Sequence, residues 1–377
     1  MPVSRVLILG GYGNFGKRIA ESLSASQGIT VIIAGRNLQK AQALCTQLAE
    51  KGVSAMLEPS QIDIGSANFE VELERLSPDL VIHTSGPFQG QTYRVPEACI
   101  AVGSHYIDLA DDRRFVCDIQ ALNAKALERK VLLVSGASSV PGLSSVVIDH
   151  FLEHFSSLEE IDFAIAPGNR AERGEATVKG ILSYTGHPFP VLHQGQWVDR
   201  YGWMSPRKLC FGDVVGSRWL ANVDIPDLEL FPKRYPSANT VRFQAGLELS
   251  LLHLGMVFMA LWAKLGLVKD WSRFTRVIII SSEIFKRWGT DVGGMKVMLS
   301  GRDKNNQPKR IHWLLCAEHG VGPYIPTLSA IILAKKLIVG SIDQLGAMPC
   351  LGLFTLEEFD QEAKQLGIYH HTEFLDG

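Results

Sequence analysis

The feature that most constrains the fold is a glycine-rich turn that separates an apolar run from a helix-like run near the N-terminus. Residues 6–9 are Val-Leu-Ile-Leu, residues 10–16 read Gly-Gly-Tyr-Gly-Asn-Phe-Gly, and residues 17–23 resume with helical spacing. The turn spells G-x-G-x-x-G, whose glycines permit a tight bend, close approach to a pyrophosphate, and close packing of the helix on the strand. We therefore expect a strand–turn–helix unit that binds a dinucleotide. Its contacts are predicted at Gly11, Tyr12, Gly13, Asn14, Phe15 and Gly16.

The end of the second predicted strand, residues 29–34, indicates which dinucleotide binds. An NAD site usually carries Asp or Glu near this point for the ribose 2′-hydroxyl. No carboxylate stands in residues 31–42, whereas Arg36 occupies the place and Lys40 follows about one helical turn later. A guanidinium pairs with phosphate oxygens through a planar fork, which favours NADP(H) over NAD(H). In the alternative, Arg36 is a solvated residue that opens a helix, with Asn37 as its N-cap.

Alternating strands and helices predict a doubly wound parallel sheet over the first part of the chain. Buried strands are expected at residues 29–34, 80–84, 105–109 and 131–134. Ser85, Gly86 and Pro87 follow one of these strands, and a loop at the carboxyl end of a central strand lies where nicotinamide and substrate usually meet. Asp63 ends a shorter strand, where it could bond the adenine or equally cap the turn that follows.

Beyond about residue 140 the pattern changes to antiparallel elements with longer connections. Residues 295–300 and 309–317 alternate about a turn at 303–307, which predicts a hairpin. The fold class is therefore α/β: a Rossmann-type doubly wound parallel sheet plus a second, mixed α/β domain with antiparallel strands. The predicted domains are 1–140 for NADP binding, 141–322 for substrate and dimerisation, and 323–377, helices that return to the first domain.

Composition excludes several classes of function. The 377 residues are 46% hydrophobic and 20% charged, with a formal net charge of −2. Such a balance offers no general attraction to nucleic acid, and no basic block with interleaved aromatic residues is present. The six cysteines are scattered without a C-x-x-C pair, so we expect neither a metal site nor a disulfide scaffold. No signal peptide is recognised, so a cytoplasmic location is expected.

An uncharged apolar segment runs from Leu249 to Ala263, and it admits three interpretations. It is shorter than the roughly 18–20 residues of a spanning helix. The first interpretation is a buried or dimer-interface helix, and a homodimer is our default expectation. The second is a helix that lies on a membrane or shapes an apolar pocket, because Trp262 and Lys264 suit an interface. The third is a true membrane span.

Reduction of a carbonyl or imine also needs a proton donor. The candidates are His83, at the end of a central strand, and Tyr106 and Asp108, at the end of the next. Structural roles remain open: His83 as a packed strand histidine, and Asp108 as a cap or an ion-pair partner. The spacings of a Ser–His–Asp triad, a zinc site and a P-loop are lacking.

Several segments together resemble the saccharopine dehydrogenase-like oxidoreductases. They are Gly10–Gly16, Ala34–Arg36, Ser85–Phe88, Ala98–Ile100, His105–Leu109, Val140–Leu143, Gly293–Met295 and Gly320–Pro326. The resemblance implies a nucleotide-binding Rossmann domain, a mixed α/β domain and hydride transfer to or from a nicotinamide, in a family that includes enzymes making or breaking a C–N bond through an imine. The match is to a broad branch of unassigned substrate, because no cluster of arginines is recognised in the second domain that would clamp an amino diacid.

Three functions remain as alternatives. The first is an NADP(H)-dependent oxidoreductase of a small carbonyl, imine or amino-acid-like compound. The second places the same chemistry on an apolar or lipid-like substrate, with peripheral contact to a membrane. The third is a non-enzymatic protein that keeps NADP(H) as a structural or sensing ligand.

Overall fold

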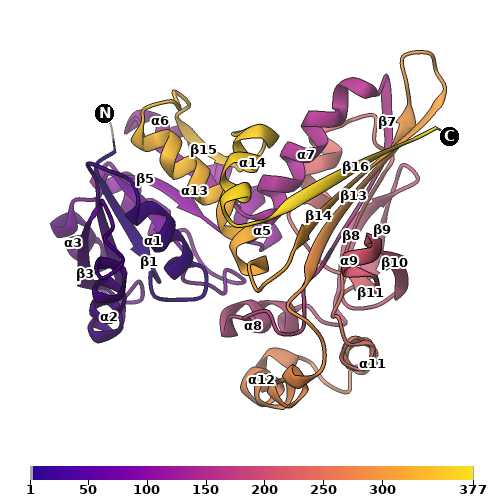
Figure 1. The fold of residues 1–377 in the computed structure, drawn as a ribbon, viewed down its shortest axis with the longest axis horizontal. Coiled ribbons are helices and arrows are strands. Elements are labelled where there is room, and N and C mark those ends of the chain that lie inside the picture. Colours follow the sequence, from indigo (N-terminus) through magenta and orange to yellow (C-terminus); the bar gives the residue numbers. More distant parts are fainter. Residues whose placement is uncertain (1–2, 377) are drawn as a thin grey trace. The chain divides into compact units, whose positions relative to one another are not determined.

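The computed structural model describes residues 3–376, and they divide into two compact units. Of the described residues, unit 1 comprises 3–143 with Tyr324–Phe354, and unit 2 comprises Ser144–Pro323 with 355–376. Each unit contains its own seven-stranded sheet. The units are therefore described one at a time (Figure 1).

Unit 1 is built on a sheet whose strands are all parallel, in the order β15-β6-β5-β4-β1-β2-β3. The strands are β1 (Arg5–Leu9), β2 (Thr30–Gly35), β3 (Met56–Gln61), β4 (Leu80–His83), β5 (His105–Asp108), β6 (Leu132–Ser135) and β15 (Gly346–Pro349). The helices are α1 (Gly16–Ser24), α2 (Leu38–Ala49), α3 (Phe69–Leu76), α4 (Arg94–Val102), α5 (Arg113–Cys117), α6 (Asn123–Glu128) and α13 (Ile325–Ile338). Strand order reverses between β1 and β4, the position at which doubly wound sheets bind ligands.

The central strands of unit 1 are apolar because helices cover both faces of a parallel sheet. Every residue of β2 and β4 is buried. Leu7, Ile32, Val81, Tyr106 and Leu133 belong to one core cluster that spans five neighbouring strands. The predicted doubly wound sheet is thus confirmed, and its carboxyl edge gathers the loops that follow each strand.

Unit 2 contains a mixed sheet in the order β10-β11-β12-β7-β13-β14-β16. The strands are β7 (Ser157–Ala166), β10 (Arg207–Cys210), β11 (Ser217–Asn222), β12 (Thr240–Ala245), β13 (Gly293–Arg302), β14 (Pro308–Ala317) and β16 (Tyr369–Asp376), and β8 (Pro188–His193) pairs with β9 (Gln196–Tyr201) in a separate hairpin. The helices are α7 (Ser144–Phe151), α8 (Glu175–Ser183), α9 (Gly212–Val215), α10 (Asp227–Arg234), α11 (Ser250–Lys264), α12 (Thr275–Glu283) and α14 (Leu356–Gln365). Only β7 and β12 pair in parallel among the described strands of this sheet, so the predicted mixed domain with antiparallel strands is present.

The segment 323–377, predicted to be helices that return to the first domain, is divided between the two units. Helix α13 and strand β15 belong to unit 1, but α14 and β16 belong to unit 2. The reason is strand pairing, because β16 adds to the edge of β14 over eight residue pairs. A capping box at Thr355 and Glu358 starts α14 just beyond the boundary between the units.

The apolar segment 249–263 forms α11 in unit 2. Among the described residues, no helix is both long and apolar enough to cross a membrane, so the membrane-span interpretation was wrong.

Candidate functional site

The glycine-rich turn lies at the carboxyl end of β1, beside the switch point of the sheet. The N–H groups of Gly10 and Gly11 donate to the Ala34 carbonyl at 2.9 and 3.0 Å, which anchors the turn to β2. A Cβ on Gly11 would lie 2.9 Å from the Ile8 carbonyl oxygen, and one on Gly16 would lie 2.7 Å from the Gly11 Cα. Side chains at positions 11 and 16 are therefore excluded by backbone packing.

The middle of the turn is open where a diphosphate would approach. Gly13 is exposed, and α1 begins three residues later. Within the described chain, no side chain caps this helix and its first turn carries no acidic residue. Backbone N–H groups and the helix dipole at such an end favour an anion. The residues present therefore fit the pyrophosphate of a dinucleotide.

Asn14 and Phe15 shape the turn through contacts within it. The Arg18 guanidinium donates to Asn14 Oδ1 at 2.5 Å, and the Phe15 carbonyl accepts from the Ile19 N–H at 3.1 Å. These bonds join residues of the chain to one another and do not test a contact with the cofactor. The predicted cofactor contacts of Asn14 and Phe15 therefore stay predictions.

Tyr12 connects the turn to the end of β2. Its hydroxyl oxygen accepts from the Asn37 N–H at 2.8 Å, and a Cβ on Gly35 would lie 2.6 Å from that oxygen. The ring therefore rests against Gly35 and fixes the corner that carries Arg36. This placement gives Tyr12 a positioning role that the sequence pattern did not specify.

The β2 corner contains the helix cap that the alternative interpretation expects, and the contact of Arg36 with a 2′-phosphate stays a prediction. Asn37 is the N-cap of α2, and its side chain accepts from the Lys40 N–H at 3.0 Å. The Arg36 and Lys40 side chains are exposed, and within residues 3–376 the Arg36 guanidinium makes no hydrogen bond or ion pair. The Arg36 guanidinium is therefore available to bind an anionic group of a ligand beside the glycine turn.

Asp63 follows β3 and caps its own turn. Its Oδ1 accepts from the Gly65 N–H at 2.9 Å, as one of the two sequence interpretations expects. The side chain is exposed, so its contact with adenine stays a prediction.

The loop after β4 packs directly against the glycine turn. A Cβ on Gly10 would lie 2.7 Å from Ser85 Oγ and 2.9 Å from Thr84 Oγ1. Gln91 Nε2 donates to the carbonyls of Ser85 and Pro87 at 2.9 and 2.7 Å, which holds the loop in place. Residues 84–87, which include Gly86, are half-buried and line the carboxyl edge beside the turn.

Strand register brings the three predicted proton carriers together. His83 pairs with Asp108 across β4 and β5, and His83 Nδ1 lies 3.0 Å from Tyr106 Oη. All three side chains are fully buried, and the His83 ring contacts Phe88 edge-on at 5.0 Å. Burial lowers the pKa of His83 to about 3, raises the pKa of Asp108 to about 6 and raises the pKa of Tyr106 well above its ordinary value.

Asp108 organises the loops that follow β5 and β6. Its Oδ1 accepts from the N–H groups of Ala110 and Gly136 at 2.9 and 2.8 Å, and from Ser135 Oγ at 3.0 Å. A fully buried carboxyl with these partners holds backbone in place. Proton transfer by this cluster stays a prediction.

A further acidic residue at the same edge was not singled out from the sequence. Asp111 is half-buried, and its Oδ1 accepts from Gln89 Nε2 at 3.1 Å, which joins the β4 loop to the β5 loop. Burial raises the pKa of Asp111, so this carboxyl holds its proton to a higher pH than an ordinary aspartate. The signal that could have found it is its place just past a central strand.

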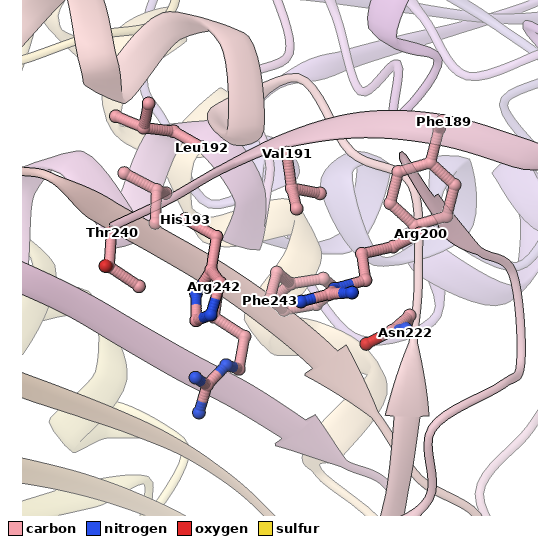
Figure 2. Close-up of a pocket in the computed structure, with 10 residues that line it drawn as sticks. Phe189, Val191, Leu192, His193, Arg200, Asn222, Thr240, Arg242 and Phe243 are labelled. Atoms are coloured by element: carbon pink, nitrogen blue, oxygen red, sulfur yellow. The ribbon is translucent and has the colours of Figure 1, made fainter. Parts of the chain in front are cut away.

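Unit 2 contains arginines that the sequence did not show to be close together. Arg207 and Arg242 both donate to the Asp162 carboxylate, at 2.5–2.6 Å and 3.1 Å. Arg242 and Arg200 line a cavity of about 40 Å³ between the β8–β9 hairpin and β12, with His193 beside them (Figure 2). Strand pairing sets these distances, which residue spacing does not reveal. The expectation that no arginine cluster in this domain would clamp an amino diacid stays a prediction. Asp162 offsets part of the cluster's charge.

Within residues 3–376, no group of three or more His, Cys, Asp or Glu side chains is placed to hold a metal ion.

Comparison with known families places the glycine turn in a defined type of domain. Residues 6–135 match the family model described as the saccharopine dehydrogenase NADP binding domain. The matched segment contains the turn, Arg36 and the loop after β4. The prediction of NADP as the cofactor is confirmed by this match.

Comparison with solved structures extends the likeness to the whole chain. The fold is similar to that of apo saccharopine dehydrogenase (L-Glu forming) from Saccharomyces cerevisiae, with a TM-score of 0.69, 14% identity, and coverage of 99% of this chain and 100% of that one. The MalC reductase/Diels-Alderase from Malbranchea aurantiaca (TM-score 0.29, 16% identity) covers 36% of this chain and 73% of its own length. No curated protein sequence matches the chain. The likeness to the yeast structure confirms the predicted α/β fold class.

Proposed function

We propose, from the match of residues 6–135 to the saccharopine dehydrogenase NADP binding domain, that the chain is an NADP(H)-dependent oxidoreductase. Its substrate class is a small carbonyl, imine or amino-acid-like compound. The nicotinamide supplies or accepts the hydride, and the protein positions the reacting carbon and excludes water.

The β2 corner is the observation that carries the proposal. Arg36 is exposed beside the turn, and Tyr12 holds that corner through its bond with the Asn37 N–H. An arginine fork suits the 2′-phosphate of NADP(H), a group that NAD(H) lacks. Selection of the phosphorylated cofactor supports NADP(H) as the hydride donor or acceptor of the proposed reaction.

The half-buried β4 loop supports a polar substrate of modest size. Ser85 and its neighbours lie at the carboxyl edge of the central strands, where substrates of such sheets bind. We assign the proton-donor role to Asp111 rather than to the buried His83 cluster. Asp111 is partly accessible, its pKa is raised by burial, and Gln89 orients its carboxyl group. A carboxyl group whose pKa is raised is better suited than an ordinary aspartate to donate a proton to a carbonyl or imine.

Turnover over a panel of substrates tests this function. The purified 377-residue chain is incubated with NADPH and aldehydes, ketones, 2-oxo acids with ammonia, or preformed imines. For the reverse direction it is incubated with NADP⁺ and amino acids. The proposal predicts oxidation or reduction of the cofactor with at least one class, and a large loss of kcat with little change in NADPH affinity for Asp111→Asn.

A matched control uses a neighbouring carboxyl group with a different role. Asp112 caps α5 by accepting from the Phe115 N–H at 2.8 Å, so Asp112→Asn should retain the cap and the activity. Tight NADPH binding without turnover on any class would instead favour the non-enzymatic alternative.

A further inference from the structure

Two helical segments of unit 2 expose an unusual number of large apolar side chains. Leu251, Phe258, Ile280 and Trp288 have exposed fractions of 68%, 54%, 69% and 59%. We name the whole set the α11–α12 face; it comprises Leu251, Leu254, Phe258, Leu261, Trp262, Leu265, Leu267, Phe274, Val277, Ile280, Ile284 and Trp288. Figure 1 shows α11 and α12 at one end of unit 2, below its sheet.

The large exposed side chains of α11 lie on the side of the helix that faces away from the rest of unit 2, because the opposite side packs against unit 2. His253, Met256, Ala260 and Ala263 recur at helical spacing and are buried. A Cβ on Gly186 would lie 2.6 Å from Ala263 Cβ, so small residues meet there at close range. The helix thus buries His253, Met256 and two alanines on its inward side, and its large exposed apolar residues lie on the other side.

An aromatic series links the outward side of α11 to Phe274, the residue that precedes α12. Ring centroids lie 4.8 Å apart for Phe258 and Trp262, 6.4 Å for Trp262 and Trp271, and 5.8 Å for Trp271 and Phe274. Trp271 Nε1 donates to the Met259 carbonyl at 2.8 Å, which fixes the connection to α11. Monomeric proteins rarely expose contiguous apolar patches beyond a few hundred Å². A large aromatic residue has roughly 150–250 Å² of surface. The four aromatic residues of the face are 39–59% exposed, and eight aliphatic side chains add to their exposed apolar area.

The charges on these segments are basic. Residues 249–290 carry six Lys or Arg and two Asp or Glu, a surplus of four positive charges in a chain of net charge −2. The six basic side chains, all exposed, are Lys264, Lys269, Arg273, Arg276, Lys286 and Arg287. Glu175 on α8 pairs with Arg276 at 3.5 Å and reduces the local surplus to three. The apolar face is therefore accompanied by positive charge.

We propose that the α11–α12 face docks on an anionic lipid membrane. The apolar side chains would enter the boundary between headgroups and acyl chains, and the basic side chains would meet lipid phosphates. Tryptophan with Lys and Arg suits such an interface. A second copy of the chain fits less well, because a symmetric dimer through this face would set the same basic side chains against each other. The contact is peripheral, since no described helix is long and apolar enough to cross.

Vesicle sedimentation of the full chain tests the proposal directly. We expect the protein to sediment with vesicles of phosphatidylcholine mixed with phosphatidylglycerol, more weakly with phosphatidylcholine alone, and less at high salt. The variant Leu254→Ser/Phe258→Ser/Ile280→Ser should lower the bound fraction about tenfold or more, because apolar burial supplies the attachment. Lys269→Ala/Arg287→Ala should weaken binding to the anionic vesicles by roughly tenfold and leave the neutral ones unaffected.

A matched control removes equally exposed apolar side chains from unit 1. Val71 and Val339 are 67% and 73% exposed, so Val71→Ser/Val339→Ser should sediment as the parent chain does. NADPH binding and circular dichroism, retained in every variant, separate loss of docking from loss of fold. Failure of the parent chain to sediment would overturn the proposal, as would unchanged sedimentation of the triple serine variant. A dimer that the triple serine variant converts to monomer, without vesicle binding by either, would assign the face to a second copy instead.

Discussion

The carboxyl edge of the unit 1 sheet and the α11–α12 face of unit 2 are surfaces of opposite construction. At the edge, glycines bring backbone close to backbone, and Tyr12, Asp63 and Asp108 each accept from a backbone N–H. On the face, one side of α11 is packed inward and large apolar residues remain exposed on the other side. The edge is specified by a local motif with fixed spacing. The α11–α12 face depends on which side of each helix is covered by neighbouring elements. That can be seen only in the folded structure.

The largest expected effect comes from filling the glycine turn. In Gly16→Val, the new Cβ would overlap the Gly10 carbonyl and approach the Gly11 Cα, so helix and strand must separate. We expect a loss of stability of about 3 kcal/mol, at the upper end of overpacking costs, and loss of NADPH binding. Urea unfolding and calorimetry measure both effects.

The matched control for this change lies on the other surface. Gly255 is an exposed helical residue of α11, and a Cβ there would meet nothing within 4 Å. Gly255→Ala should leave NADPH binding unchanged and raise helix stability by up to about 1 kcal/mol. If Gly16→Val bound NADPH as tightly as this control, the turn would not be the cofactor site.

Removing the cation at the β2 corner should have the next largest effect. Arg36→Ala deletes a charge-assisted contact, typically worth about 1.5–3 kcal/mol, so NADPH binding should weaken about 10- to 100-fold. NADH binding should change little, because NADH lacks the 2′-phosphate. Calorimetry with both nucleotides checks this, and Arg75→Ala on exposed α3 serves as the control. Equal losses for both nucleotides would mean that Arg36 supports the loop instead.

The two sides of α11 should respond differently to substitution. Ala260→Leu places bulk at the close contact with Gly186 and should cost about 1–3 kcal/mol. Leu254→Ser changes an exposed side chain and should alter stability by less than about 0.5 kcal/mol. Urea unfolding of both variants measures the difference. A large loss for Leu254→Ser would show that the outward side is buried, as in the first interpretation of segment 249–263.

The buried pair at the edge should give opposing pH dependences. Burial lowers the pKa of His83 from 6.5 to about 3, so its stabilising contribution is complete above pH 6.5 and falls with acidification. Burial raises the pKa of Asp108 from 3.8 to about 6, so its contribution is complete below pH 3.8 and is lost as the pH rises through 6. Each slope is at most about 1.4 kcal/mol per pH unit, and the two offset each other where they overlap.

Single variants should separate these contributions. Relative to the double variant His83→Gln/Asp108→Asn, the free energy of unfolding of Asp108→Asn should rise with pH between about 4 and about 6, because His83 is then the titrating member of the pair. Relative to the same double variant, that of His83→Gln should fall with pH over this range, because Asp108 is then the titrating member. Urea titrations at several pH values measure both slopes. Slopes of the same sign in both variants would contradict the assigned burial effects.

The sequence was sufficient for the elements whose signals are local. The glycine turn, the apolar parallel strands and the β13–β14 hairpin each follow from short-range patterns, and the structure contains all three. The Asn37 cap was likewise foreseen as one of two alternatives. Such signals depend on spacing within about a dozen residues.

The remaining features depend on contacts between distant residues. The pairing of β16 with β14 joins segments about 60 residues apart, and its own sequence of histidines and charges gives no clear apolar alternation. The convergence of Arg207 and Arg242 on Asp162 depends on strand register. The burial of His83 depends on Phe88 and Tyr106 lying over it. None of these distances can be read from residue spacing.

Calorimetric titration of the unmodified chain with NADPH and with NADH tests the central claim most directly. The glycine turn and the exposed Arg36 predict saturable binding of NADPH at least about tenfold tighter than that of NADH, since one charge-assisted contact separates the two. Equal affinity for both nucleotides would contradict the role of Arg36. No heat with either nucleotide would contradict the cofactor site itself.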